Sequence, residues 1–218
     1  MNLSKVTLPT YSKTEEIINA ASHGAGIIVG AVSFILCLSK SIETNALIGN
    51  IIFSLAVIIL YTCSTLYHSV TNTTTKKIMR LIDHSSIFIL ITGTSTAMSV
   101  ICVLPHSPFF SITVSTVSIA LSILGTVLTV IDQEKYKKVQ LVLYLVVGWI
   151  SVILIYPIYK YRADAITLII ITAIGGIIYT IGTVFYKLGK KKKYFHSVFH
   201  FFVLAGTLIH LAAIYMAI

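Results

Sequence analysis

Long runs of apolar residues alternate with short polar stretches along the chain. Each run is close to the roughly 20 apolar residues that a helix needs to cross the hydrocarbon core of a bilayer. Such runs predict seven membrane-spanning helices, at residues 17–39, 46–70, 81–103, 109–131, 139–158, 165–186 and 194–217. We therefore expect an all-α integral membrane protein in which residues 1–218 form a single seven-helix transmembrane domain, with residues 1–16 as a short N-terminal segment.

The composition supports this class of protein. Hydrophobic residues make up 56% of the chain and charged residues only 11%, whereas soluble domains contain about 25% charged residues. The first 16 residues are polar, with Lys5, Lys13, Glu15 and Glu16, and lack the apolar core of a signal peptide. We therefore expect no secretory signal, and we expect the first apolar segment to remain as a membrane helix.

The basic residues favour one orientation in the membrane. A net charge of +9 would suggest nucleic-acid binding in a soluble protein, but here the lysines lie between apolar segments. With the N-terminus in the cytoplasm, thirteen of the 16 basic residues, including Lys190 to Lys193, fall on the cytoplasmic side. Only Lys40, Lys160 and Arg162 fall on the other side. The positive-inside rule thus predicts a cytoplasmic N-terminus and an outside C-terminus, with membrane lipids rather than nucleic acid as partners.

Glycines indicate where helices pack closely. The segment "GAGIIVG" places Gly26 and Gly30 four residues apart, and Gly175 with Gly176 interrupts the sixth predicted span. Small residues at this spacing let helix backbones approach each other in lipid. We interpret these glycines as structural.

Three predicted spans carry polar residues at their cytoplasmic ends. The second ends with "CSTLYHS", which places Ser64 and His68 on one helix face. The third begins with "LIDHSS", which contains Asp83, and the seventh begins with His196 and His200, again four residues apart. An ionisable residue inside a span is by default a functional hypothesis. We expect these five residues to meet in one layer of the membrane.

This set of residues suits a metal site. Two histidines at i and i+4 can hold one ion, and His68 would complete the three protein ligands of a catalytic zinc site. Zinc lowers the pKa of water to about 7 and polarises carbonyl groups. Asp83 would position or deprotonate that water, or bind the metal directly, and Ser64 would hydrogen-bond a ligand, the water or a developing oxyanion. The alternatives are interface or core histidines and a Ser64 hydroxyl bonded to its own helix.

The other histidines fit the metal hypothesis less well. His84 adjoins Asp83 but points about 100° around the helix from it, so packing or an interface position is favoured. His23 shares the predicted depth and could contact a substrate or the surroundings of the metal. His106 lies in an outer turn. His210 is ten residues beyond His200, roughly 15 Å along the helix axis, which is too far to bind the same ion.

Four segments, in order, resemble the hemolysin III family: "EEIINAASHGAG", "CSTLYHS", "IDHSSIFILITGT" and "FHSVFHFFVLAGTLIH". This family is the bacterial branch of the progestin and adiponectin receptor family, which is grouped with alkaline ceramidases among metal-dependent hydrolases. The resemblance implies a zinc ion on His68, His196 and His200, with Asp83 near the catalytic water and Ser64 beside it. It also implies the bacterial plasma membrane as the location.

Three functions follow as hypotheses. The first is a zinc-dependent hydrolase of a lipid amide or ester bond, ceramidase-like, or a sensor of lipid state that uses the same pocket. The second is a pore-forming cytolysin, as the family name states, although a chain without a soluble domain argues against a conventional secreted pore former. The third is a regulator in which zinc clamps the second, third and seventh spans, with Asp83 as a fourth ligand.

Overall fold

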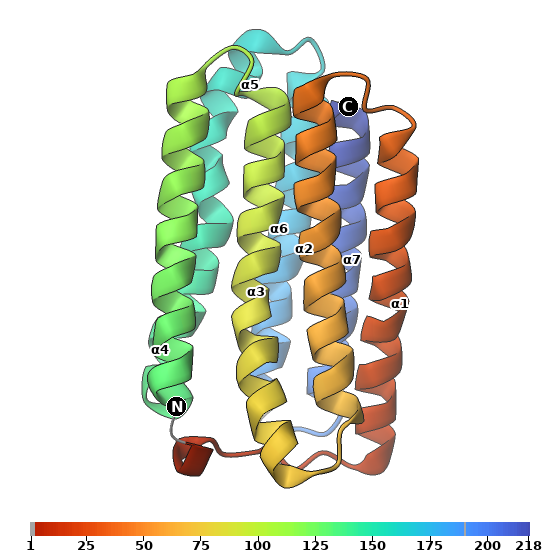
Figure 1. Cartoon of the computed structure of the whole chain (residues 1–218), viewed down its shortest axis with the longest axis vertical. Coiled ribbons are helices and arrows are strands. Elements are labelled where there is room, and N and C mark those ends of the chain that lie inside the picture. Colours follow the sequence, from red (N-terminus) through yellow and green to blue (C-terminus); the bar gives the residue numbers. More distant parts are fainter. Residues whose placement is uncertain (1–2, 190) are drawn as a thin grey trace.

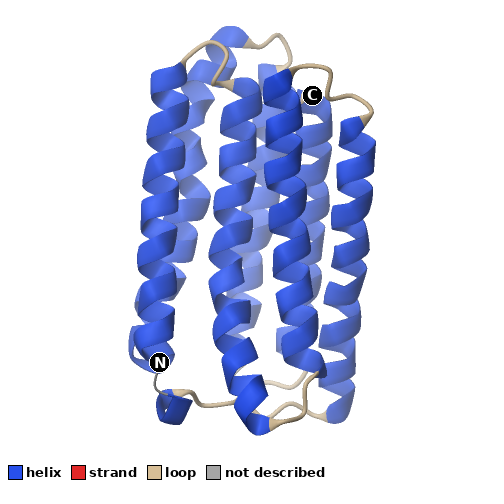
Figure 2. Ribbon diagram, in the orientation of Figure 1, coloured by secondary structure: helices blue, strands red, loops and turns tan. Residues whose placement is uncertain are grey.

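The computed structural model describes residues 3–189 and 191–218, and these residues form a bundle of helices without strands (Figures 1 and 2). The long helices are α1 (Lys13–Leu38), α2 (Thr44–Ser69), α3 (Thr73–Cys102), α4 (Pro108–Trp149), α6 (Ala165–Leu188) and α7 (Phe195–Ala217). Shorter elements are the 3-10 turns η1 (Leu3–Lys5) and η2 (Ile150–Leu154) and the helix α5 (Ile155–Tyr161). Lys190, one of the predicted cytoplasmic lysines, lies outside the described residues, as do Met1 and Asn2.

Six helical stretches in the described part of the chain are long and apolar enough to cross a membrane. The predicted spans 109–131 and 139–158 fall within one of them, Pro108–Tyr161, so the helix count of seven is not confirmed. Inside this stretch Asp132 has extended backbone angles, φ −163° and ψ 90°. Its Oδ1 accepts a hydrogen bond from the Lys135 N–H at 3.1 Å, which caps the helix that resumes. After this break the chain runs back toward the opposite end of the bundle (Figure 1).

Side-chain caps define the helix ends near the predicted site. A capping box between Ser12 and Glu15 starts α1. Helix α3 starts well before the predicted residue 81, because Asn72 Oδ1 accepts a hydrogen bond from the Thr75 N–H at 3.0 Å. The polar residues that precede the apolar run therefore belong to the helix as well.

Close packing in the interior contrasts with an apolar outer surface. Helix α2 packs against α1 and α3, and α7 packs against α6 and α1. A Cβ atom on Gly26 would overlap the ring of Tyr61, so the predicted close approach of helices at this glycine is confirmed. Outward-facing side chains such as Ile28, 66% exposed, leave the outer surface apolar. An apolar surface of this extent is typical of a protein surface that faces the lipids of a membrane.

The two termini lie at opposite ends of the bundle (Figure 1). Helix α2 ends, and α7 begins, at the end where the N-terminal segment lies. The predicted site residues of these two helices are therefore at that end.

Candidate metal centre

Three buried histidines from two helices form a cluster. His68 lies in the last turn of α2, and His196 and His200 lie in the first two turns of α7. Each offers a ring nitrogen, and these nitrogens all lie within 4.8 Å of one another. The sequence predicted that these residues meet, and the structure brings them together. We call His68, His196 and His200 the histidine cluster.

The nitrogen positions fit a metal ion. The Nε2 atoms of His196 and His200 are 3.2 Å apart. Two imidazole ligands of one tetrahedral zinc ion, each about 2.0–2.1 Å from the metal, have nitrogens about 3.3–3.4 Å apart. The Nε2 atom of His68 is buried and has no hydrogen-bond partner among the described residues. A buried nitrogen without a partner is costly, and a bound cation would satisfy it.

Residues of α1 orient two of the imidazoles. The Nδ1–H of His68 donates to Glu16 Oε2 at 2.6 Å, and the Nδ1–H of His200 donates to the backbone carbonyl of Asn19 at 3.2 Å. Each bond places the ring proton on Nδ1 and leaves the Nε2 lone pair directed to the cluster. Metal-ligating histidines typically donate their second ring nitrogen in this way. Glu16 and Asn19 were not among the predicted site residues, although both lie in the segment "EEIINAASHGAG".

Asn19 also connects α1 to α7. It is fully buried, and its Oδ1 accepts a hydrogen bond from Ser197 Oγ at 2.6 Å. Its Nδ2 lies 3.5 Å from His68 Nδ1. One amide side chain therefore contacts both helices that carry the histidine cluster.

Asp83 and Ser64 are buried and line the same cavity as His196 and His200. Asp83 Oδ2 lies 3.5 Å from Nδ1 of His84, which belongs to the same helix. The His84 Nδ1–H donates to the Arg80 carbonyl at 2.9 Å, and its Nε2 lies 3.2 Å from the Tyr186 hydroxyl. His84 therefore lines the cavity rather than a lipid interface. The roles of Asp83 and Ser64 stay predictions.

His23 lies directly against the cluster. Its ring stacks on that of His200, with centroids 3.7 Å apart and planes 19° apart, and it meets the edge of the Tyr61 ring at 4.9 Å. Both ring nitrogens of His23 are buried without a hydrogen-bond partner among the described residues. The depth predicted for His23 is confirmed by this contact.

The N-terminal segment covers the cluster. The ring of Tyr11 stacks on His196, with centroids 5.0 Å apart and planes 16° apart. Lys5 Nζ pairs with Asp132 Oδ2 at 3.1 Å, and Thr7 Oγ1 donates to Glu134 Oε1 at 2.8 Å. These bonds tie the segment to the end of the bundle. Burial raises the pKa of Tyr11 above its usual range, so its hydroxyl stays protonated.

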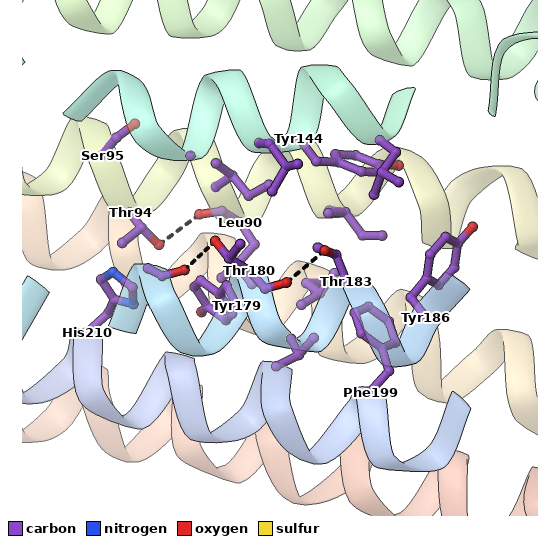
Figure 3. A pocket seen from close by; sticks show the side chains of 18 of the residues that line it. Leu90, Thr94, Ser95, Tyr144, Tyr179, Thr180, Thr183, Tyr186, Phe199 and His210 are labelled. Atoms are coloured by element: carbon purple, nitrogen blue, oxygen red, sulfur yellow. Dashed lines mark hydrogen bonds between the residues drawn. The ribbon is translucent and has the colours of Figure 1, made fainter. Parts of the chain in front are cut away.

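A cavity extends from the cluster into the bundle. His196, His200 and Asp83 line one part of it, and His210 lines another. In Figure 3, Tyr186 and Phe199 lie at one end and His210 at the other. Most of the remaining lining is apolar. We call it the central cavity.

The comparisons with known proteins identify the family. A family model described as Haemolysin-III related matches residues 11–211. The chain belongs to the haemolysin-III-related family. By this membership and by its apolar helices it is a multi-pass membrane protein. The resemblance found in the sequence motifs is therefore confirmed.

Individual relatives agree with the match to the family model. The chain is 33% identical to "Hemolysin-3 homolog" of Bacillus subtilis (strain 168), over 90% of this chain and 91% of that protein. It is 30% identical to "Hemolysin-3" of Bacillus cereus, over 93% of this chain and 91% of that protein. It is also 31% identical to "Monocyte to macrophage differentiation factor" of Homo sapiens, over 42% of this chain and 36% of that protein. No solved structure matches the chain significantly.

Proposed function

We propose that the protein holds one zinc ion on His68, His196 and His200 and hydrolyses an amide or ester bond of a membrane lipid. The observation that carries this proposal is the convergence of three buried imidazole nitrogens beside a cavity with a mostly apolar lining. Three neutral imidazoles are a ligand set that suits zinc and leaves one coordination position open.

The proposed setting is the bacterial plasma membrane, crossed seven times by a single domain of residues 1–218. The reversal of the chain at Asp132 supports two crossings by the stretch Pro108–Tyr161. The distribution of lysines and arginines supports a cytoplasmic N-terminus, with residues 1–16 as a cytoplasmic segment. The histidine cluster would then lie near the cytoplasmic face.

The side chains have distinct roles in this proposal. A bound zinc ion supplies Lewis acidity and activates water for attack on a carbonyl. The Asp83 carboxylate accepts a proton from the attacking water and returns it to the leaving group. The Ser64 hydroxyl donates a hydrogen bond to the developing oxyanion. Glu16 and Asn19 hold His68 and His200 in position, and the central cavity takes up the acyl chain.

Metal content tests the proposal first. The protein is purified in mild detergent without added metal, and bound metal is measured by elemental mass spectrometry beside His68→Ala and His196→Ala. His106→Ala is the matched control, because His106 lies in a turn and stacks on Tyr161 rather than on the cluster. We expect about one zinc per chain in the wild type and the control, and none in the two cluster variants. A folded wild-type protein that binds no metal would remove the hydrolase chemistry.

Turnover is tested next on metal-loaded protein. Lipid amides and esters are offered in micelles, and release of fatty acid is followed for the wild type and for Asp83→Asn. We expect turnover only in the wild type. Saturable lipid binding without turnover in either protein would instead support the sensing function.

The names of the two Bacillus relatives favour a second candidate, a pore-forming cytolysin. Liposomes that contain the purified protein and a trapped dye test this function. Dye release that is retained in the His68→Ala variant would establish a pore that does not depend on the histidine cluster. Intact liposomes would exclude direct membrane lysis.

A further inference from the structure

The central cavity has a second polar region, around His210 on α7. His210 follows His200 by ten residues in the same helix, which places it roughly 15 Å farther along the helix axis. It is buried, and it lines the end of the cavity away from Tyr186 and Phe199 (Figure 3). The hydrolytic chemistry proposed above makes no use of this residue.

One nitrogen of His210 is left to accept a hydrogen bond. Its Nδ1–H donates to the backbone carbonyl of Gly206 at 2.8 Å. A neutral imidazole that carries its proton on Nδ1 is an acceptor at Nε2. Among the described residues, the hydrogen bond from Nδ1 is the only one found for the His210 ring.

The ring of His210 is held in place from two sides. The Tyr179 ring stacks on it, with centroids 5.2 Å apart and planes 13° apart. On α6, Gly175 provides the space that the imidazole fills, since a Cβ atom there would overlap the ring. The orientation of the acceptor nitrogen is thus fixed by packing.

The hydroxyl groups nearby also present acceptors. Thr94 Oγ1 donates to the Leu90 carbonyl at 2.8 Å, and Ser95 Oγ donates to the Thr92 carbonyl at 3.1 Å. Figure 3 shows both residues at the same end of the cavity as His210. Because their protons are bonded within their own helix, their free lone pairs can only accept. The Thr172 hydroxyl, which also lines the cavity, is buried without a partner among the described residues.

We propose that this deep region binds a hydrogen-bond donor, such as a hydroxyl group, at the far end of an apolar chain. This inference rests on the part of the proposed function in which an acyl chain occupies the central cavity. The ligand class is therefore an amphipathic lipid whose reactive carbonyl lies at the histidine cluster and whose second polar group is a hydroxyl. A plain alkyl chain would leave the acceptors of this region unpaired.

The single tryptophan of the chain provides a direct reporter of binding. Trp149 lines the central cavity, so a ligand that fills the cavity changes its fluorescence. The probes are fatty acyl amides with a terminal hydroxyl group and the same amides without it, each over a series of chain lengths. The full chain is used in detergent micelles, in the Asp83→Asn background so that no probe is hydrolysed.

We expect the hydroxylated amide of one optimal length to bind roughly three- to tenfold more tightly than its plain counterpart, as one additional hydrogen bond predicts. His210→Phe should abolish this preference, because phenylalanine fills the space without an acceptor. Gly175→Ala should reduce the preference by displacing the ring. Gly24→Ala, where a Cβ meets nothing within 4 Å, should leave it unchanged.

Equal affinities for both probes at every length would overturn the inference, as would a preference that survives in a folded His210→Phe variant. The outcome is separable from that of the hydrolase proposal. A hydroxyl preference without lipid turnover in the wild type supports this site and contradicts the hydrolase. Lipid turnover in the wild type without a hydroxyl preference supports the hydrolase and contradicts this site.

Discussion

His68 on α2 donates its Nδ1–H to Glu16 on α1 across 2.6 Å. The same carboxylate pairs with Lys76 Nζ, from the first turn of α3, at 2.8 Å. Three helices are thus connected through one carboxylate next to the histidine cluster. A carboxylate in this position fixes the ring orientation and strengthens the imidazole as a metal ligand.

The Glu16→Gln variant is predicted to weaken zinc binding about 10- to 100-fold, the range seen when such a supporting carboxylate is lost. The glutamine keeps the size of the side chain but removes the charge that pairs with His68. Competition with a chromogenic zinc chelator measures the affinity.

Glu43→Gln is the matched control for this variant. Glu43 precedes α2 at the end opposite His68, is exposed, and makes no capping bond. Its substitution should leave zinc affinity within the error of the assay. If Glu16→Gln behaves like Glu43→Gln, the carboxylate has no part in holding the metal ligand.

The sequence predicted the histidine cluster because the ends of the apolar runs and the spacing along the helix indicate where each of the three histidines lies. His68 closes an apolar run, and the spacing of His196 and His200 puts them on one helix face. Glu16 and Asn19 were not predicted, since hydropathy does not fix which way α1 is rotated about its axis. The only signal was a pair of polar residues at the start of an apolar segment. The predicted spans 109–131 and 139–158 leave residues 132–138 as a loop. In the structure only Asp132 departs from helical backbone angles inside α4, because Gln133 and the residues after it favour helix.

Asn19→Ala is predicted to lower both stability and metal affinity. The substitution leaves the Ser197 hydroxyl without its acceptor, and loss of a buried partner costs about 1–3 kcal/mol. Asn50→Ala is the matched control, because Asn50 is equally buried and bonds the Phe34 carbonyl in the other half of the bundle. Thermal unfolding in detergent should show destabilisation of both variants. Zinc affinity should fall only in Asn19→Ala, and a fall in both would mean that the effect is general.

Gly26→Ala is predicted to destabilise the contact between α1 and α2. A methyl group at this position would overlap the Tyr61 ring, which also contacts the His23 ring. Overpacking of this kind typically costs about 1–3 kcal/mol. Gly24→Ala in the same helix meets nothing within 4 Å and should be tolerated. Thermal unfolding measures the stability of both variants, and we expect a lower midpoint for Gly26→Ala than for Gly24→Ala. Equal midpoints would show that the helices can separate at no cost.

Tyr11→Ala is predicted to speed the removal of metal. The Tyr11 ring lies over His196 at the end of the bundle, so its loss opens a path between the cluster and the surrounding water. Stopped-flow mixing of zinc-loaded protein with an excess of chelator measures the rate, which should rise several-fold. Tyr159→Ala is the control, because Tyr159 is 66% exposed and lies in α5. Identical rates in both variants would contradict a covering role.

The number of crossings decides the side of the membrane on which the C-terminus lies. If each of the six apolar stretches crossed once, both termini would share one side. If the stretch Pro108–Tyr161 crosses twice by turning at Asp132, the termini lie on opposite sides, as their positions in the bundle suggest (Figure 1). We predict that alkaline phosphatase fused to the C-terminus is active outside the cell membrane and that green fluorescent protein fused to the N-terminus fluoresces. An inactive phosphatase, with the same fusion fluorescent when green fluorescent protein replaces it, would establish six crossings instead.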